Sequence, residues 1–309
     1  MMGCWFRAGW LAILFVLVQA PSGWAQGAVI GACDEALPLS ASQKDRLIRF
    51  AALVKAQLEA SNHRVALIAR SGTDLDYFDQ RYSHAGISLQ ASSNTPWSVR
   101  QLYYDCEAAK PQVFDQGLTG FVLGVNNPKQ SYVSLLLLPT AAGQAVEQVA
   151  LSNQRALELL GDHYSANAHA FALPYQNCNQ WVIETLAVAW GDLAQNNPSD
   201  SPLRRQAQDW LKQQAYEPTR FELGGWPLMW LSHLIPWLRH DDHPRADLDQ
   251  YIFRVSMPAS IETFTRQQVA DIKRVEFCLR DNKVLMRRGW EPISSSCQAQ
   301  EGDVVTVLD

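Results

Sequence analysis

After its first 25 residues the chain has no uninterrupted apolar run of the roughly 20 residues that a membrane-spanning helix requires. It also lacks an excess of basic residues, because the chain without residues 1–25 has 25 basic and 31 acidic residues, a net charge of −6. Internal repeats and low-complexity tracts are absent from the sequence as well. We therefore expect no transmembrane segment in the mature chain and no nucleic-acid partner.

The length and composition are those of a folded protein. The chain has 309 residues, of which 47% are hydrophobic, so it can bury one large core or two modest ones. This hydrophobic fraction argues against intrinsic disorder.

Residues 1–25 have the layout of a secretory signal peptide. A short basic region with Arg7 precedes the apolar run 8–20, and a small-residue cleavage site ends at Ala25. We therefore expect an exported protein, periplasmic or secreted. The Ile-Gly-Ala-Cys sequence ending at Cys33 loosely resembles a lipoprotein cleavage site, but it lies well past the apolar run that such a site normally abuts. Soluble export is thus preferred to anchoring at Cys33.

The mature chain retains an odd number of cysteines, which is informative in an oxidising compartment. Cys278 and Cys297 flank a predicted β-hairpin and are natural disulfide partners. Cys33 and Cys106 are the second expected pair, although sequence alone does not determine the connectivity. Under this pairing Cys178 keeps its thiol.

Periodicity and turn residues predict the following elements. Helices are expected over residues 39–60, 145–160, from Cys178 onward and 203–215, and strands over 65–70, 83–89, 97–104, 131–138, 251–255, 275–279, 283–286 and 304–307. A turn-rich stretch at 196–202 separates two parts of the chain.

Cys178 lies where a helix is expected to begin. Apolar residues recur at helical spacing from Trp181 onward, and Asn177 is a suitable N-cap. The positive end of the helix dipole favours a thiolate over a thiol at this position. The alternative interpretation is a small buried core residue, since cysteine is among the most buried residue types.

His84 lies on a predicted strand. Alternation over residues 83–89 places His84, Gly86 and Ser88 on one face of that strand. Because Gly86 has no side chain, a substrate or another backbone can approach His84 closely. A cysteine hydrolase needs a thiolate and an imidazole that moves the proton, and Cys178 and His84 are residues of these two types.

These two motifs resemble a known superfamily. His84-Ala-Gly-Ile87, followed much later by Asn177-Cys-Asn-Gln-Trp-Val182, is similar to the circularly permuted branch of the NlpC-type, papain-like superfamily, which includes lecithin retinol acyltransferase-like enzymes. Its members carry a His-x-Gly-Ile/Val strand and then Asn-Cys-(Glu/Asn)-His-Phe-Val, whereas in the unpermuted families the cysteine comes first. The chain also resembles, over most of its mature length, the bacterial family called domain of unknown function 2145.

The superfamily resemblance covers roughly residues 62–192 and implies roles for two residues. It implies that Cys178 is the nucleophile and His84 the general base. Gln180 and Trp181 replace the His and Phe of the relatives, so Gln180 is assigned no catalytic role.

Relatives place a third polar residue on the strand after the histidine. Gln101 is the choice here, with Arg100 and Ser98 as rivals. Its amide oxygen would accept an N–H from His84 and orient the imidazole. The alternative, that Gln101 is an ordinary surface residue, stays open.

For the oxyanion hole we expect the backbone N–H of Cys178, helped by Tyr175 or Gln176. Tyr175 is alternatively a packed ring beside the helix. No metal site and no cofactor is expected, because the adjacent side chains of His240–His243 cannot all converge on one ion and that segment is interpreted as a solvated loop. The aromatic-rich segment 224–237 is either buried packing or a flap that contacts a substrate.

We therefore expect an α+β fold of permuted papain-like topology, with an antiparallel sheet packed on the Cys178 helix. The expected organisation is a signal peptide (1–25), a catalytic domain with a helical lead (26–195) and a helical and β extension (196–309). The leading hypothesis is an exported thiol hydrolase or acyltransferase that cleaves an amide, isopeptide or ester of a peptide, cell-wall or lipid substrate. The rival is a catalytically silent binding or accessory module of the periplasm.

Overall fold

The computed structural model describes residues 38–105, 107–108, 110–193 and 201–308. The predicted signal peptide and both members of the expected Cys33–Cys106 disulfide lie outside these residues.

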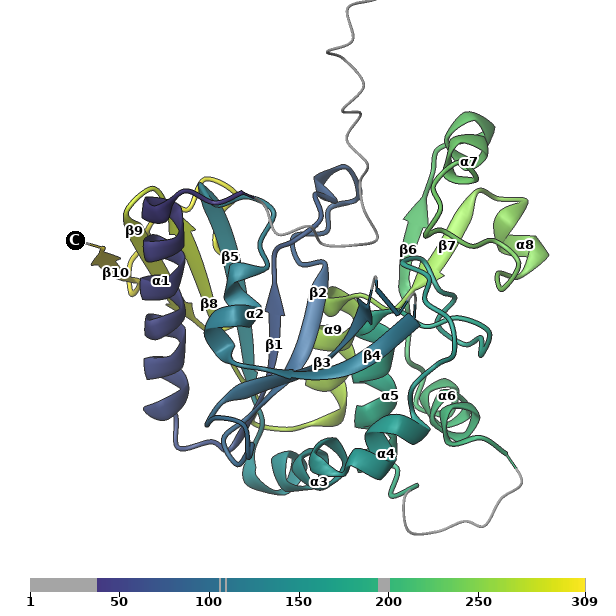
Figure 1. Ribbon diagram of the computed structural model, residues 1–309, viewed down its shortest axis with the longest axis horizontal. Coiled ribbons are helices and arrows are strands. Elements are labelled where there is room, and N and C mark those ends of the chain that lie inside the picture. The colour runs from purple at the N-terminus through teal and green to yellow at the C-terminus, as the bar shows by residue number, and fades with distance from the viewer. Residues whose placement is uncertain (1–37, 106, 109, 194–200, 309) are drawn as a thin grey trace, which may run out of the picture. The chain divides into compact units, whose positions relative to one another are not determined.

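A large antiparallel sheet organises the described chain (Figure 1). Its eight strands follow the order β10-β9-β8-β5-β1-β2-β3-β4. The bounds are β1 (Val65–Arg70), β2 (His84–Leu89), β3 (Ser98–Asp105), β4 (Lys110–Gln116), β5 (Gln130–Leu137), β8 (Lys273–Arg280), β9 (Lys283–Arg288) and β10 (Val304–Val307). The expected α+β class with an antiparallel sheet is confirmed.

Helices cover both faces of this sheet. Across the described residues the helices are α1 (Ala41–Glu59), α2 (Leu118–Leu123), α3 (Thr140–Leu151), α4 (Asn153–Glu158), α5 (Cys178–Trp190), α6 (Leu203–Gln213), α7 (Trp226–Ser232), α8 (Arg245–Leu248) and α9 (Pro258–Gln268). The single helix expected over 145–160 is two helices, because Ser152 adopts an extended conformation and its side chain accepts a hydrogen bond from the N–H of Arg155, starting α4.

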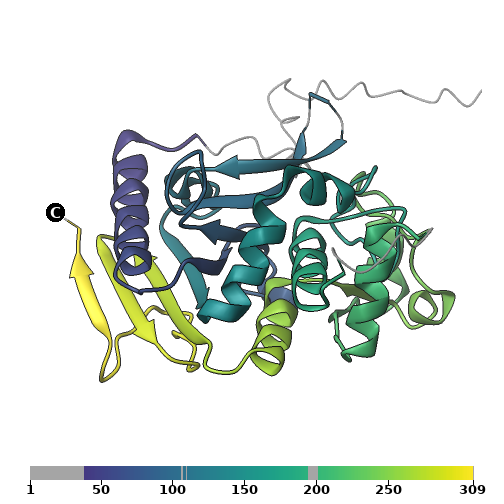
Figure 2. The ribbon, with the colours of Figure 1, turned by 90° about the horizontal axis from the view of Figure 1, so that it is seen from below.

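The two faces of the sheet have separate hydrophobic cores. Alternate residues of β1 point to opposite sides. On the first side, which we call the α1/α2 face, Ile68 packs with residues of α1 and α2 such as Phe50 and Phe121. On the second, which we call the α5 face, Leu67 packs with residues of α3, α5 and α9, including Trp181. Figures 1 and 2 show α1 and α9 on opposite sides of the sheet.

The helix over residues 41–59 begins and faces the sheet as its sequence predicts. Ser40 caps it, since the Ser40 hydroxyl accepts from the N–H of Gln43 while the Gln43 side chain accepts from the N–H of Ser40. Its inward positions are all apolar and buried: Leu47, Phe50, Ala51, Val54 and Leu58. This stripe at helical spacing fixes α1 on the sheet.

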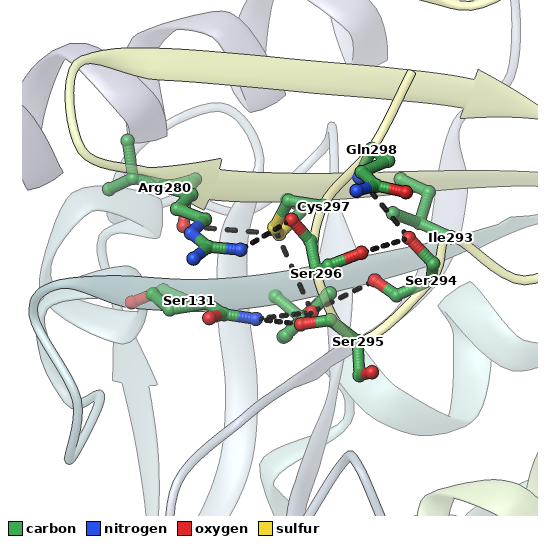
Figure 3. Close-up of a disulfide and its surroundings, with 12 residues drawn as sticks. Ser131, Arg280, Ile293, Ser294, Ser295, Ser296, Cys297 and Gln298 are labelled. Carbon is green, nitrogen blue, oxygen red and sulfur yellow. Dashed lines mark hydrogen bonds between the residues drawn. A yellow bond between two sulfur atoms is a disulfide. The ribbon is translucent and has the colours of Figure 1, made fainter. Parts of the chain in front are cut away.

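The C-terminal strands belong to the large sheet. β8 of the segment 196–309 pairs along its whole length with β5, and β9 and β10 continue the sheet outward. The predicted Cys278–Cys297 disulfide is confirmed, and it ties the loop after β9 to β8. In Figure 3 Arg280 lies beside this loop, and its guanidinium donates to the carbonyl of Ser296 at 2.6 Å.

A second, two-stranded sheet pairs β6 (Thr219–Glu222) with β7 (Ile252–Val255). It has its own small core, in which Phe221, Met229 and Phe253 pack together. α7 and α8 lie in the chain between its two strands.

Candidate functional site

Cys178 is the first residue of α5, as the sequence predicts. The side-chain oxygen of Asn177 accepts a hydrogen bond from the N–H of Gln180 at 2.7 Å and so caps this helix. The side chain of Asn179 donates to the carbonyl of Ser83 at 3.1 Å, which anchors the first turn of α5 beside the start of β2. Cys178 itself is only 6% exposed and packs in the core of the α5 face.

A buried ion pair holds the segment that precedes Cys178. The guanidinium of Arg204 pairs with Glu184 at 2.9 Å and donates to the carbonyls of Leu173 and Tyr175 at 2.8 and 3.2 Å. Because both charges of this pair are buried, their mutual pairing is needed to offset the loss of hydration. The backbone at the entrance to α5 is thereby fixed in place.

The two residues expected to help an oxyanion hole are occupied elsewhere. The buried amide of Gln176 accepts from the N–H of Gly161 at 2.8 Å and donates to Glu184 at 2.6 Å. The exposed hydroxyl of Tyr175 donates to Asp241 at 3.0 Å. These hydrogen bonds hold the side chains of Gln176 and Tyr175 to partners other than Cys178.

His84 is buried in an environment that keeps its ring neutral. Burial lowers the pKa of His84 to about 3, and the charge of Arg70 acts in the same direction, whereas the hydrogen bond to Gln101 raises it. The ring lies against those of Tyr103 and Phe121, with centroids 5.4 and 5.7 Å away. A protonated His84 paired with a thiolate is therefore not the resting state of this environment.

Gln101 contacts His84 directly. Its Oε1 lies 2.5 Å from His84 Nε2, and its own amide nitrogen donates to Oε1 of Gln116 at 2.7 Å. Because the amide nitrogen is used by Gln116, the oxygen faces the ring and accepts the proton of Nε2. This contact leaves Nδ1 of the neutral imidazole as its basic atom. The two alternatives to Gln101 have other partners. Arg100 donates to the carbonyl of Ala150 at 2.5 Å, and the hydroxyl of Ser98 donates to the carboxylate of Asp115.

The strand register separates His84 from Cys178. His84 is paired with Arg70 and Gly86 with Ile68, so the His84 side chain projects from the α1/α2 face. Its contact with Phe121 of α2 agrees with this placement. Cys178 packs instead on the α5 face. The structure thus brings His84 and Gln101 together but leaves Cys178 on the other side of the sheet.

Gly86 is required by close packing within the sheet. A Cβ at this position would collide with the Val99 side chain and would lie 3.2 Å from the carbonyl oxygen of Arg100. The absence of a side chain therefore accommodates the neighbouring strand β3, in addition to any approach by a ligand.

A small, partly enclosed pocket lies on the α5 face between the sheet and α9. Its lining combines apolar residues with two polar ones, Ser134 and Glu262. Neither Cys178 nor His84 belongs to this lining.

Residues 240–243 form a loop, as predicted, but the expectation that this loop is solvated is wrong for Asp242 and His243. Asp242 accepts from the backbone N–H of His169 at 2.8 Å, and His243 Nε2 donates to the carbonyl of Asn167 at 2.8 Å. Both Asp242 and His243 have buried side chains. Burial, with the nearby His243, lowers the pKa of His169 to about 4. The sequence contained one signal for this contact, namely two histidines and two acids close together. It did not indicate that segment 165–169 would be their partner.

Neither metal binding nor membrane crossing finds support among the residues that the structure describes. No group of three or more His, Cys, Asp or Glu side chains there is arranged to hold a metal ion. None of the helices in this part of the chain has the length and apolar character that crossing a bilayer requires.

Comparison with known proteins identifies one family. Curated proteins and solved structures gave no significant match. A family model described as "Uncharacterized protein conserved in bacteria (DUF2145)" matches residues 57–265, which include β1 to β5, α5 and the β6–β7 sheet. Since this match spans more than half of the chain, the protein belongs to the DUF2145 family of bacterial proteins.

Proposed function

We propose that this protein is an exported binding or accessory module of permuted papain-like architecture that does not use Cys178 and His84 as a catalytic pair. The observation that carries this proposal is the register of β2, which directs His84 to the α1/α2 face while Cys178 packs on the α5 face. A general base must come within hydrogen-bonding reach of the proton that it removes. The placement of the two side chains on opposite faces of the sheet supports a module in which they do not react together.

The burial of both groups supports the same proposal. Cys178 is 6% and His84 9% exposed, so a substrate carbonyl has little access to either. The papain-like assignment is supported by the order of the elements, a His-x-Gly-Ile strand followed by a helix that begins with cysteine and packs on the sheet.

The thiol hydrolase or acyltransferase is the second candidate, and two observations favour it. Asn177 seats Cys178 at the positive end of the α5 dipole. Gln101 accepts the Nε2 proton of His84, as an orienting amide should. In this hypothesis Cys178 attacks an amide, isopeptide or ester carbonyl to form a thioester, His84 protonates the leaving group, and water or another acceptor then releases the acyl group. It requires β2 to present His84 on the side of Cys178.

Alkylation of Cys178 by iodoacetamide distinguishes the two candidates. The binding module predicts that Cys178 in the native protein reacts slowly between pH 5 and 9, and that His84→Ala leaves the profile of rate against pH unchanged. The hydrolase predicts appreciable reaction well below about 8.5, the ordinary pKa of a thiol, with a shift to higher pH in His84→Ala.

Peptide mapping assigns the alkylated cysteine, and His163→Ala is the matched control because His163 is an exposed histidine. A profile that shifts in His84→Ala but not in His163→Ala would overturn the binding-module proposal. Rapid alkylation of Cys178 that is unchanged in His84→Ala would contradict both candidates. The binding module predicts a slow reaction, and the hydrolase predicts a reaction that depends on His84.

A further inference from the structure

Residues 223–238, which we call the aromatic arm, are unusual for a surface segment. They include no Asp, Glu, Lys or Arg and contain three tryptophans, Trp226, Trp230 and Trp237. Within the arm lies α7, which follows the end of β6 and lies apart from the large sheet (Figure 1). Segment 224–237, for which the sequence allows either buried packing or a flap, is mostly exposed.

The inward side of α7 has its own partners. Met229 is buried against Phe221 and Phe253 in the core of the small sheet. Ser232, three residues further on, is also buried, and its hydroxyl lies 2.8 Å from Nε2 of His240. This side accounts for the attachment of α7 to the rest of the chain.

The outward side of α7 is apolar as well. Trp226, Trp230 and Leu234 follow one another at four-residue spacing and are 68%, 59% and 63% exposed. Leu234 continues the line because its N–H donates to the carbonyl of Leu231 at 3.0 Å, extending the helical turn past the end of α7. Leu228 and Leu231 enlarge the exposed surface. A helix that packs on one side and faces water on the other carries polar residues outside, so this stripe indicates a partner.

The arm is held in place at its base. The rings of His233 and His240 stack with centroids 3.7 Å apart. The carbonyl of Trp237 accepts from the N–H of Ala166 at 3.0 Å, which joins the end of the arm to the segment before α5. The exposed side chains therefore project from a fixed support.

We propose that the aromatic arm docks onto the surface of a lipid bilayer, with Trp226, Trp230 and Leu234 entering the boundary between headgroups and acyl chains. Tryptophan and leucine are the residues that favour this boundary in helices lying on membranes. The arm projects these side chains and carries no charge that would need a complementary charge on a protein partner.

The residues that flank the arm carry both signs. Arg220 is paired with Glu222 before it, and Arg239 is followed by Asp241 after it. Attraction to anionic lipid is therefore not required, and the proposed target is a zwitterionic bilayer. This inference does not depend on the state of Cys178 or His84, since neither belongs to the arm.

Flotation of the processed protein with phosphatidylcholine vesicles tests the proposal. We expect the protein to float with the vesicles and Trp226→Ala/Trp230→Ala to bind at least tenfold more weakly. Leu157→Ala is the matched control, because Leu157 is 61% exposed on α4, away from the arm, and this variant should bind like the unmodified protein. Adding phosphatidylglycerol should change the affinity less than twofold at 0.15 M salt.

Two further measurements keep the test decisive. Far-ultraviolet circular dichroism reports whether the double variant folds, and quenching of tryptophan fluorescence by brominated phosphatidylcholine tests the unmodified protein independently of any variant. The proposal is overturned if the protein neither floats nor is quenched, or if the double variant binds as well as Leu157→Ala. It is also overturned if light scattering finds a dimer that the double variant converts to monomer, since the occupant is then a second copy of the chain.

Discussion

The amide of Gln101 determines where the proton of the neutral His84 ring resides. Its oxygen accepts from Nε2 because its nitrogen is already used by Gln116. Burial of the ring against Tyr103 and Phe121, and then the nearby charge of Arg70, disfavour its protonation. At the scale of single residues, this network is built to hold a neutral imidazole, which is consistent with a structural role.

Replacing Gln101 changes this network in two predictable ways. Gln101→Leu removes the acceptor, leaves the Nε2 proton of buried His84 unpaired and should reduce the free energy of unfolding by about 1–3 kcal/mol. Gln101→Glu places a carboxylate there and should raise the pKa of His84 above its value of about 3. Denaturant unfolding measures the first effect, and the ring resonances of His84 in an NMR titration measure the second. An unchanged pKa in Gln101→Glu would show that the two side chains do not touch in solution.

At the scale of elements, the contact between segments 165–169 and 237–243 joins the aromatic arm to the segment that leads into α5. Besides the bonds of Asp242 and His243, the N–H of Arg239 donates to Asn167 at 2.8 Å. Ionisable groups meet here from four parts of the chain: His169; His233; His240, Asp241, Asp242 and His243; and Asp247 with Arg254.

This contact should weaken on acidification. Burial lowers the pKa values of His169 and His240 to about 4 and also lowers that of His243, so the separated segments bind more protons than the packed ones. The contribution of these histidines is therefore fully present above pH 6.5 and is lost as pH falls toward 4. Burial raises the pKa of Asp242, which offsets part of the loss.

Hydrogen exchange at the N–H of Arg239 measures the effect. After correction for the intrinsic dependence of exchange on pH, protection should fall between pH 7 and pH 5, while amides in β5 of the sheet keep theirs. Equal protection of the Arg239 amide at both pH values would contradict the prediction.

At the scale of the whole molecule, the C-terminal strands extend the sheet that carries His84. β8 adds to β5, and the Cys278–Cys297 disulfide holds the loop after β9 against it. Around the same loop, buried Glu276 accepts from the N–H of Ile293 at 2.7 Å and pairs with Arg274 at 3.2 Å. The disulfide is thus one of several ties across this end of the sheet.

Cys278→Ser/Cys297→Ser should be less stable by about 2–4 kcal/mol, because the bridge closes a loop with a sequence separation of 19 and limits the unfolded chain. Chemical denaturation of the double variant and of the unmodified protein measures the difference. A loss below about 0.5 kcal/mol would mean that the hydrogen bonds of Glu276 and its neighbours hold the loop without the bridge.

Local chemistry explains what was predictable from the sequence. The cap at Ser40 and the apolar stripe of α1, the cap at Asn177 before α5, and the alternation along residues 84–89 depend on neighbours a few positions away. The pairing of Cys278 with Cys297 was predicted because the two cysteines flank an expected hairpin; the observed hairpin is β8–β9, with Cys278 inside β8 and Cys297 beyond β9. β4 was missed because its residues, Lys-Pro-Gln-Val-Phe-Asp-Gln, show neither alternation nor a continuous apolar run.

The sequence also determined that His84, Gly86 and Ser88 share one face of a strand, because side chains alternate along any strand. Which face α5 would cover depended on the tertiary structure. α5 is separated from β2 by three strands and three helices, and its side of the sheet is set by where those intervening elements pack. For the same reason, the exposure of Trp226 and Trp230 follows from the packing of Met229 on the β6–β7 core, which no local pattern encodes.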